Sequence, residues 1–125
     1  MANRRVLLID DEDDIREVAQ LSLEVVGKWD VLTASSGAEG ILCAAAEQPD
    51  AILLDVMMPD MDGRATFREL RANPRTQHIP VILLTAKIDP LEHLARDVVA
   101  VISKPFDPLR LPGEIARHLG WTACA

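Results

Sequence analysis

The chain has 125 residues, a hydrophobic fraction of 49%, and 20 acidic against 13 basic residues, for a net charge of −7. This composition fits one globular domain and argues against an intrinsically disordered chain. No apolar run approaches the ~20 residues of a membrane span, and two Trp and two Phe in an acidic chain offer little for nucleic-acid binding. With two cysteines that suit reduced thiols, we expect a single cytoplasmic domain over residues 1–125, with no membrane segment and no secretory signal.

The negative charge is concentrated in two short segments. Residues 10–14 are all acidic, and residues 55–62 contain three further Asp residues, while neither segment contains Lys or Arg. Without these eight acids, the remaining 12 acidic residues nearly balance the 13 basic ones. The acidity therefore marks two local clusters and not a uniformly anionic surface.

The first elements that the sequence predicts are strands. Four runs consist only of apolar residues, which is typical of parallel strands buried on both faces. These runs cover residues 6–9, 51–54, 81–84 and 98–102. A fifth run, residues 29–34, mixes polar and apolar side chains, as edge strands do.

Helical spacing fills the segments between these runs. The predicted helices cover residues 15–26, 36–48, 63–72, a short stretch from about 90, and about 109–119. Either Asp107-Pro108 or Pro112 starts the last helix, because proline favours the first helical turn. Alternation of strands with helices predicts an α/β domain with a doubly wound parallel sheet of five βα units, which right-handed crossovers cover on both faces.

Polar residues follow four of the five predicted strands. They are Asp10-Asp11, Asp55, Thr85 and Ser103-Lys104. Because the carboxyl ends of parallel strands meet at one sheet edge, where ligands bind in open α/β sheets, we expect these side chains to lie together. Three carboxylates there repel one another and would recruit a cation, and their hard oxygens favour Mg²⁺ over zinc. A carboxylate beside Mg²⁺ and a lysine suits attack on a phosphoryl group.

The motifs at these strand ends resemble those of a known family. They read Leu8-Ile9-Asp10-Asp11, Leu53-Leu54-Asp55 through Asp62-Gly63, Leu84-Thr85-Ala86 and Lys104-Pro105-Phe106. In this order they are similar to the receiver domains of two-component response regulators, over about residues 4–119. The resemblance implies a flavodoxin-like five-stranded parallel sheet with strand order 2-1-3-4-5.

The resemblance also implies a chemistry. Asp55 would accept a phosphoryl group from a phosphohistidine on a sensor histidine kinase or a histidine phosphotransfer protein, and the domain would catalyse only its own phosphorylation and dephosphorylation. The implied Mg²⁺ ligands are Asp10, Asp11, Asp55 and the Met57 carbonyl. Lys104 would contact the phosphoryl oxygens, Thr85 would bond to them after transfer, and the Lys104–Pro105 bond would be cis. Homodimer formation is left open.

Two departures from the family concern the switch. Val101 stands where the family usually has Tyr or Phe, and Thr85 and Lys104 are 19 residues apart, about three fewer than expected. We therefore expect a shortened fourth helix, and a switch that uses Thr85 and rearranges residues 86–97 without an aromatic rotamer. Met57 and Lys87, at positions that flank the incoming water in the family, should influence the rate of dephosphorylation.

Two alternatives remain at this point. A haloacid-dehalogenase-like phosphohydrolase would use Asp11 as nucleophile in the pattern Asp11-x-Asp13, although the chain is short for that fold. A degenerate receiver would only bind partners, which the presence of Asp55, Thr85 and Lys104 argues against. Asp13 and Asp14 are best explained as helix N-terminal acids.

Overall fold

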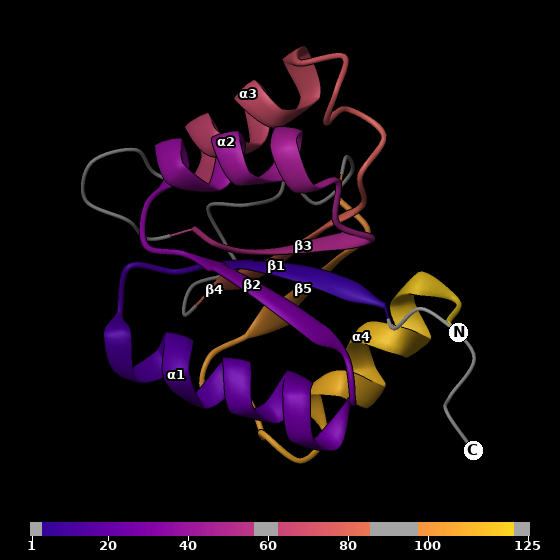
Figure 1. Cartoon of the computed structure of the whole chain (residues 1–125). Helices are drawn as coiled ribbons and strands as arrows, with labels where there is room; N and C mark the ends of the chain where they lie inside the picture. The colour runs from indigo at the N-terminus through magenta and orange to yellow at the C-terminus, as the bar shows by residue number, and fades with distance from the viewer. Residues whose placement is uncertain (1–3, 57–62, 86–97, 122–125) are drawn as a thin grey trace.

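The computed structural model describes residues 4–56, 63–85 and 98–121. Five parallel strands form one sheet in the order β2-β1-β3-β4-β5 (Figure 1), which confirms the predicted order. They are β1 (Arg5–Ile9), β2 (Asp30–Ala34), β3 (Ala51–Asp55), β4 (Val81–Thr85) and β5 (Ala100–Ser103).

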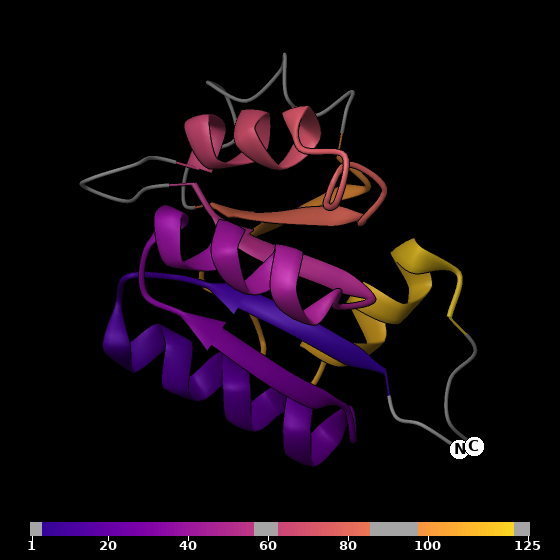
Figure 2. The ribbon, with the colours of Figure 1, turned by 45° about the horizontal axis from the view of Figure 1, so that its top comes forward.

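Helices cover both faces of this sheet. They are α1 (Asp13–Leu21), continued by the π-helical turn η1 (Ser22–Val26), then α2 (Gly37–Glu47), α3 (Gly63–Ala72) and α4 (Leu111–Leu119). α1 and α4 lie on one face and α2 and α3 on the other, as Figures 1 and 2 show. The short helix predicted near residue 90 falls outside the described residues, so α4 is the last predicted helix. None of the described helices is long and apolar enough to cross a membrane.

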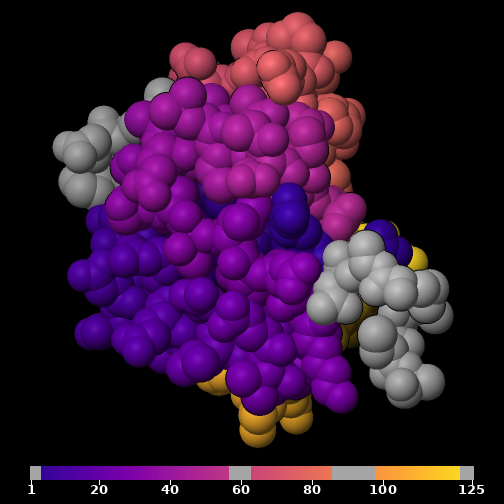
Figure 3. All heavy atoms as spheres, viewed as in Figure 1, coloured from indigo at the N-terminus to yellow at the C-terminus, as the bar shows by residue number. Residues whose placement is uncertain are grey.

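The apolar strands are buried because the helices enclose them. Alternate residues of β1 point to opposite faces: Leu7 and Ile9 join the core under α2 and α3, while Val6 and Leu8 join the core under α1 and α4. Full burial of each such side chain contributes about 1.5–3 kcal/mol. β2 is an edge strand at the surface between α1 and α2 (Figure 3), which explains its mixed sequence.

Two predicted boundaries differ from the structure. β5 begins at Ala100 and not at residue 98, because its pairing with β4 begins at Ala100, opposite Ile82. Val98 is buried in the core before the strand starts, and Val99 is 40% exposed. The last helix begins at Leu111 with Pro112 in its first turn, so that alternative was the correct one. The carboxylate of Asp107 instead accepts a hydrogen bond from the Leu109 backbone N–H at 2.9 Å and closes the preceding turn.

Gly63 is required where α3 starts against the end of β3. Its N–H donates to the Val56 carbonyl at 2.8 Å, and a Cβ atom there would lie 2.5 Å from the Val56 Cα and 2.8 Å from the Asp55 carbonyl oxygen. Since both neighbours are backbone atoms, Gly63→Ala must shift the start of α3 or the end of β3. We expect a loss of about 1–3 kcal/mol in the free energy of unfolding, measured by urea denaturation.

Gly113 provides the matched control for this substitution. It lies inside α4, and a Cβ atom there would meet nothing within 4 Å. Gly113→Ala should therefore raise the free energy of unfolding by about 0.5–1 kcal/mol through helix propensity alone. Equal effects of the two substitutions would show that the contact at Gly63 is unimportant.

Candidate functional site

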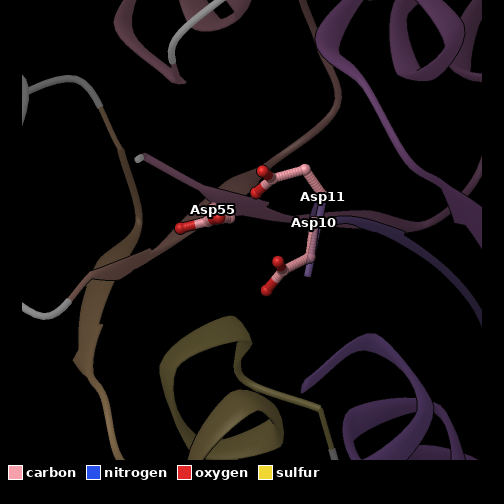
Figure 4. A group of neighbouring side chains, drawn as sticks. All are labelled: Asp10, Asp11 and Asp55. Carbon is pink, nitrogen blue, oxygen red and sulfur yellow. The ribbon is translucent and has the colours of Figure 1, made fainter. Parts of the chain in front are cut away.

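Three carboxylates meet at the carboxyl edge of the sheet. Asp10 and Asp11 follow β1 directly, and Asp55 is the last residue of the neighbouring strand β3. Their ligand oxygens lie within 4.8 Å of one another, and Figure 4 shows the side chains pointing to the same side of the strand ends. Strand pairing thus brings together acids that are 45 residues apart in sequence, and Asp10 and Asp55 are almost completely buried.

Lys104 places its ammonium group between two of these carboxylates. Its Nζ lies 3.1 Å from Asp10 Oδ2 and 3.2 Å from Asp55 Oδ1, and its side chain is only 10% exposed. The backbone positions it, because Ser103 pairs with Thr85 at the end of the sheet and the Lys104 N–H donates to the Thr85 carbonyl at 2.8 Å. The peptide bond between Lys104 and Pro105 is cis.

Electrostatics keep this lysine charged. Burial by itself would lower the pKa of Lys104, but the nearby Asp10 and Asp55 carboxylates and their hydrogen bonds outweigh it, so the pKa is raised above its ordinary value. Lys104 is therefore a permanent positive charge at neutral pH, beside the carboxylate of Asp55.

The acidic cluster fits a divalent cation. Lys104 supplies one positive charge against three carboxylates, so negative charge is in excess. Asp11 Oδ1 is buried, yet no group in the described part of the chain donates a hydrogen bond to it. A buried carboxylate oxygen without a donor is costly unless a cation binds it. A set of oxygen ligands with room for water is what Mg²⁺ prefers, so the residues present fit this ion.

The remaining predicted residues are placed as follows. Thr85 ends β4, between β3 and β5, and is almost completely buried. Val101, in β5, is paired with Leu83 of β4 and packs, partly buried, against the core under α2 and α3. Met57 and Lys87 lie outside the described residues.

Two contacts of the site were not predicted from the sequence. Glu12 Oε1 lies 3.5 Å from Lys104 Nζ, and Arg16 Nη1 donates to the backbone carbonyl of Asp10 at 2.8 Å. No sequence signal pointed to either contact, because each joins a side chain to a group that only the folded chain brings near it. Asp13 and Asp14 are exposed in the first turn of α1, which confirms their assignment as helix N-terminal acids.

Comparison with known proteins assigns the family. The family model of the response regulator receiver domain matches residues 6–116. The chain belongs to this family. It is therefore a receiver domain of two-component systems and not a haloacid-dehalogenase-like phosphohydrolase.

Relatives with this receiver domain are longer proteins. The transcriptional regulatory protein PhoP of alkaline phosphatase synthesis in Bacillus subtilis is 38% identical over 116 residues, which cover 90% of this chain and 47% of PhoP. The response regulator PleD of Caulobacter vibrioides is 40% identical over 112 residues, which cover 86% of this chain and 24% of PleD. The chain thus spans less than half the length of these relatives.

Solved structures confirm the receiver fold. The chemotaxis protein CheY4 of Vibrio cholerae superposes with a TM-score of 0.83 at 29% identity, over 93% of this chain and 98% of that one. The receiver domain of the sensor histidine kinase PA1611 from Pseudomonas aeruginosa gives a TM-score of 0.84 at 29% identity, over 95% and 99%. That structure has a magnesium ion coordinated in its active site cleft.

Proposed function

We propose that this receiver domain accepts a phosphoryl group on Asp55 from a phosphohistidine, in a Mg²⁺-dependent reaction. The donor would be a sensor histidine kinase or a histidine phosphotransfer protein. One observation carries the proposal: the buried Asp55 carboxylate lies 3.2 Å from Lys104 Nζ and beside two further carboxylates that can hold a cation.

The residues divide the chemistry between them. An Asp55 carboxylate oxygen attacks phosphorus, the new O–P bond replaces the N–P bond of phosphohistidine, and the leaving imidazole nitrogen takes up a proton from solvent. Lys104 stabilises charge on the phosphoryl oxygens, and the Thr85 hydroxyl donates to one of them after transfer. Asp10, Asp11, Asp55 and the Met57 carbonyl would hold Mg²⁺, which would neutralise further phosphoryl charge. Because an ionised aspartate is already a nucleophile, no general base is needed.

Hydrolysis returns the domain to its resting state, so the domain turns over only its own phosphoryl group. We propose that Met57 and Lys87 flank the attacking water and tune this rate. Val101 has no aromatic ring that could change rotamer, so the change at Thr85 on phosphorylation would be passed to residues 86–97 instead. Crystal forms with and without a phosphoryl mimic would test this, and an identical course of that segment in both would contradict it.

The direct test uses the wild-type domain with a small-molecule phosphodonor such as acetyl phosphate. With Mg²⁺, intact mass spectrometry should show one added phosphoryl group, and peptide mapping should place it on Asp55. Chelation of Mg²⁺ should prevent the adduct. Absence of an adduct on the wild-type domain with Mg²⁺ would refute the proposed function.

We further propose that the phosphohistidine donor docks along α1. An apolar pocket beside Lys104 is lined by Ile15, Val18, Pro105 and Phe106. Val18 is 43% exposed, and exposed apolar side chains continue from it along α1 and η1. A donor must bring its histidine to Asp55, and this pocket shares Lys104 with the site. The proposed partners are therefore proteins and not nucleic acids.

The free thiol of Cys43 agrees with a cytoplasmic setting.

Val18→Asp should slow phosphotransfer from a phosphorylated histidine phosphotransfer protein about tenfold or more, because a charge in a desolvated contact costs at least ~1.4 kcal/mol. Phosphorylation by acetyl phosphate should stay at the wild-type rate. Leu42→Asp is the matched control, since Leu42 is 73% exposed on α2, on the other face of the sheet. Equal slowing by both substitutions, or none by Val18→Asp, would place the docking surface elsewhere.

A further inference from the structure

Arg16 connects helix α1 to the end of strand β1. Its guanidinium group donates through Nη1 to the Asp10 carbonyl oxygen at 2.8 Å and through Nη2 to Asp13 Oδ1 at 2.5 Å. The side chain is only 21% exposed, although Asp13 is 86% exposed. Its own N–H donates to the Glu12 carbonyl at 2.9 Å, in the first hydrogen-bonded turn of α1. Arg16 is thus a folded-back side chain that lies against the acidic loop and does not extend into solvent.

The Asp10 carbonyl lies where the strand pairing stops. The β1 ladders to β2 and β3 both end at Ile9, so this carbonyl is past the last paired residue. It belongs to the peptide unit that joins Asp10 to Asp11. A bond to this carbonyl therefore restrains the plane of that peptide, which carries the Asp11 Cα, and so limits where the Asp11 side chain can lie.

Asp11 is the carboxylate that needs this support. Asp10 is held by two contacts of its own, from the Glu12 N–H at 2.9 Å and from Lys104 Nζ at 3.1 Å. Asp11 Oδ1, in contrast, receives no hydrogen bond from the described residues. The position of the Asp11 carboxylate thus depends on its backbone, and the Arg16 side chain holds that backbone on its N-terminal side through the Asp10 carbonyl.

We infer that Arg16 is a positioning residue for the cation site: its guanidinium fork holds the Asp10–Asp11 peptide so that the Asp11 carboxylate is in place for Mg²⁺. This inference rests on the proposed Mg²⁺-dependent function. Arg16 does not touch the cation or the phosphoryl group; it acts through Asp11.

Two effects of Arg16 on Mg²⁺ affinity oppose each other. Its positive charge disfavours a second cation nearby, whereas its hydrogen bonds orient a ligand for that cation. Asp13 neutralises much of the charge, because it is paired with the same guanidinium group. Positioning should therefore dominate, and removal of Arg16 should weaken Mg²⁺ binding instead of strengthening it.

The test measures the Mg²⁺ dissociation constant by isothermal titration calorimetry, with no phosphodonor present. Arg16→Met removes both the charge and the fork, and Arg16→Lys keeps the charge but cannot form two bonds of fixed geometry. We expect both to weaken Mg²⁺ binding by about tenfold, the lower end of the range for residues that orient a metal ligand. Arg110→Met is the matched control, since Arg110 also pairs with an Asp three residues away, Asp107, but is 80% exposed and far from the acidic cluster in sequence. It should bind Mg²⁺ as the wild type does.

Each other outcome has a definite meaning. Unchanged or tighter binding by Arg16→Met would overturn the inference, and so would wild-type affinity in Arg16→Lys, because charge alone would then suffice. Unfolding curves recorded with EDTA show whether each variant is folded, and Arg16→Lys supplies the test if Arg16→Met is not. If the wild-type domain itself binds no Mg²⁺, the proposed function fails; if the wild type binds and Arg16→Met binds equally well, only this inference fails.

Discussion

Asp55→Asn should abolish phosphorylation of the domain and leave its fold intact. The asparagine amide has nearly the shape of the carboxylate but is not a nucleophile, so no acyl phosphate can form. Lys104 keeps its ion pair with Asp10 in this variant, so the fold retains a buried partner for the ammonium group. Intact mass spectrometry after incubation with acetyl phosphate and Mg²⁺ should show the adduct on the wild type and none on Asp55→Asn.

Asp30→Asn is the control for a loss of one carboxylate. Asp30 is exposed at the start of β2, the edge strand, and removing its charge should leave the extent of phosphorylation at the wild-type level. An adduct on Asp55→Asn would show that another residue is the nucleophile. If that adduct maps to Asp11, the chemistry would be that of the dehalogenase-like alternative on a receiver fold.

The second large effect concerns Mg²⁺ and stability. At a concentration about 100 times its dissociation constant, Mg²⁺ should raise the free energy of unfolding of the wild-type domain by about 2.7 kcal/mol. Asp11→Asn should remove most of this gain, because it removes the negative charge of a carboxylate whose buried Oδ1 receives no hydrogen bond from the described part of the chain. In EDTA the same variant should be more stable than the wild type by at least about 1 kcal/mol, which is the repulsion of two unit charges about 4 Å apart even in water.

Urea denaturation with EDTA and with saturating Mg²⁺ separates these two effects. Asp30→Asn should keep the full Mg²⁺-dependent gain, since it removes a carboxylate outside the cluster. A variant Asp11→Asn that is destabilised in EDTA would mean that Asp11 holds the fold together and is not strained by its neighbours. A full Mg²⁺ effect in Asp11→Asn would show that the cation binds somewhere other than at these three aspartates.

Much of the fold could be read from local patterns. The wholly apolar runs at residues 6–9, 51–54 and 81–84 favoured strands covered on both faces over half-exposed strands, because an exposed face would carry polar residues. The four motifs at the strand ends, taken in their order along the chain, then indicated the family. Boundaries were less certain where burial and strand pairing separate: Val98 is buried like a strand residue, yet β5 starts at Ala100.

The residues that end the strands could be read from the sequence, and with them the expectation that one edge of the sheet would carry Asp10, Asp11, Asp55, Thr85 and Lys104. How these side chains meet depends on the packing of the folded chain. Lys104 lies between Asp10 and Asp55 because β5 is separated from β3 by β4, so its long side chain must reach back over the end of that strand. The contact of Arg16 with the Asp10 carbonyl depends on a side-chain rotamer and on the angle at which α1 leaves β1. Neither has a signature in composition or periodicity, because each depends on the position of groups in space and not on their order in the chain.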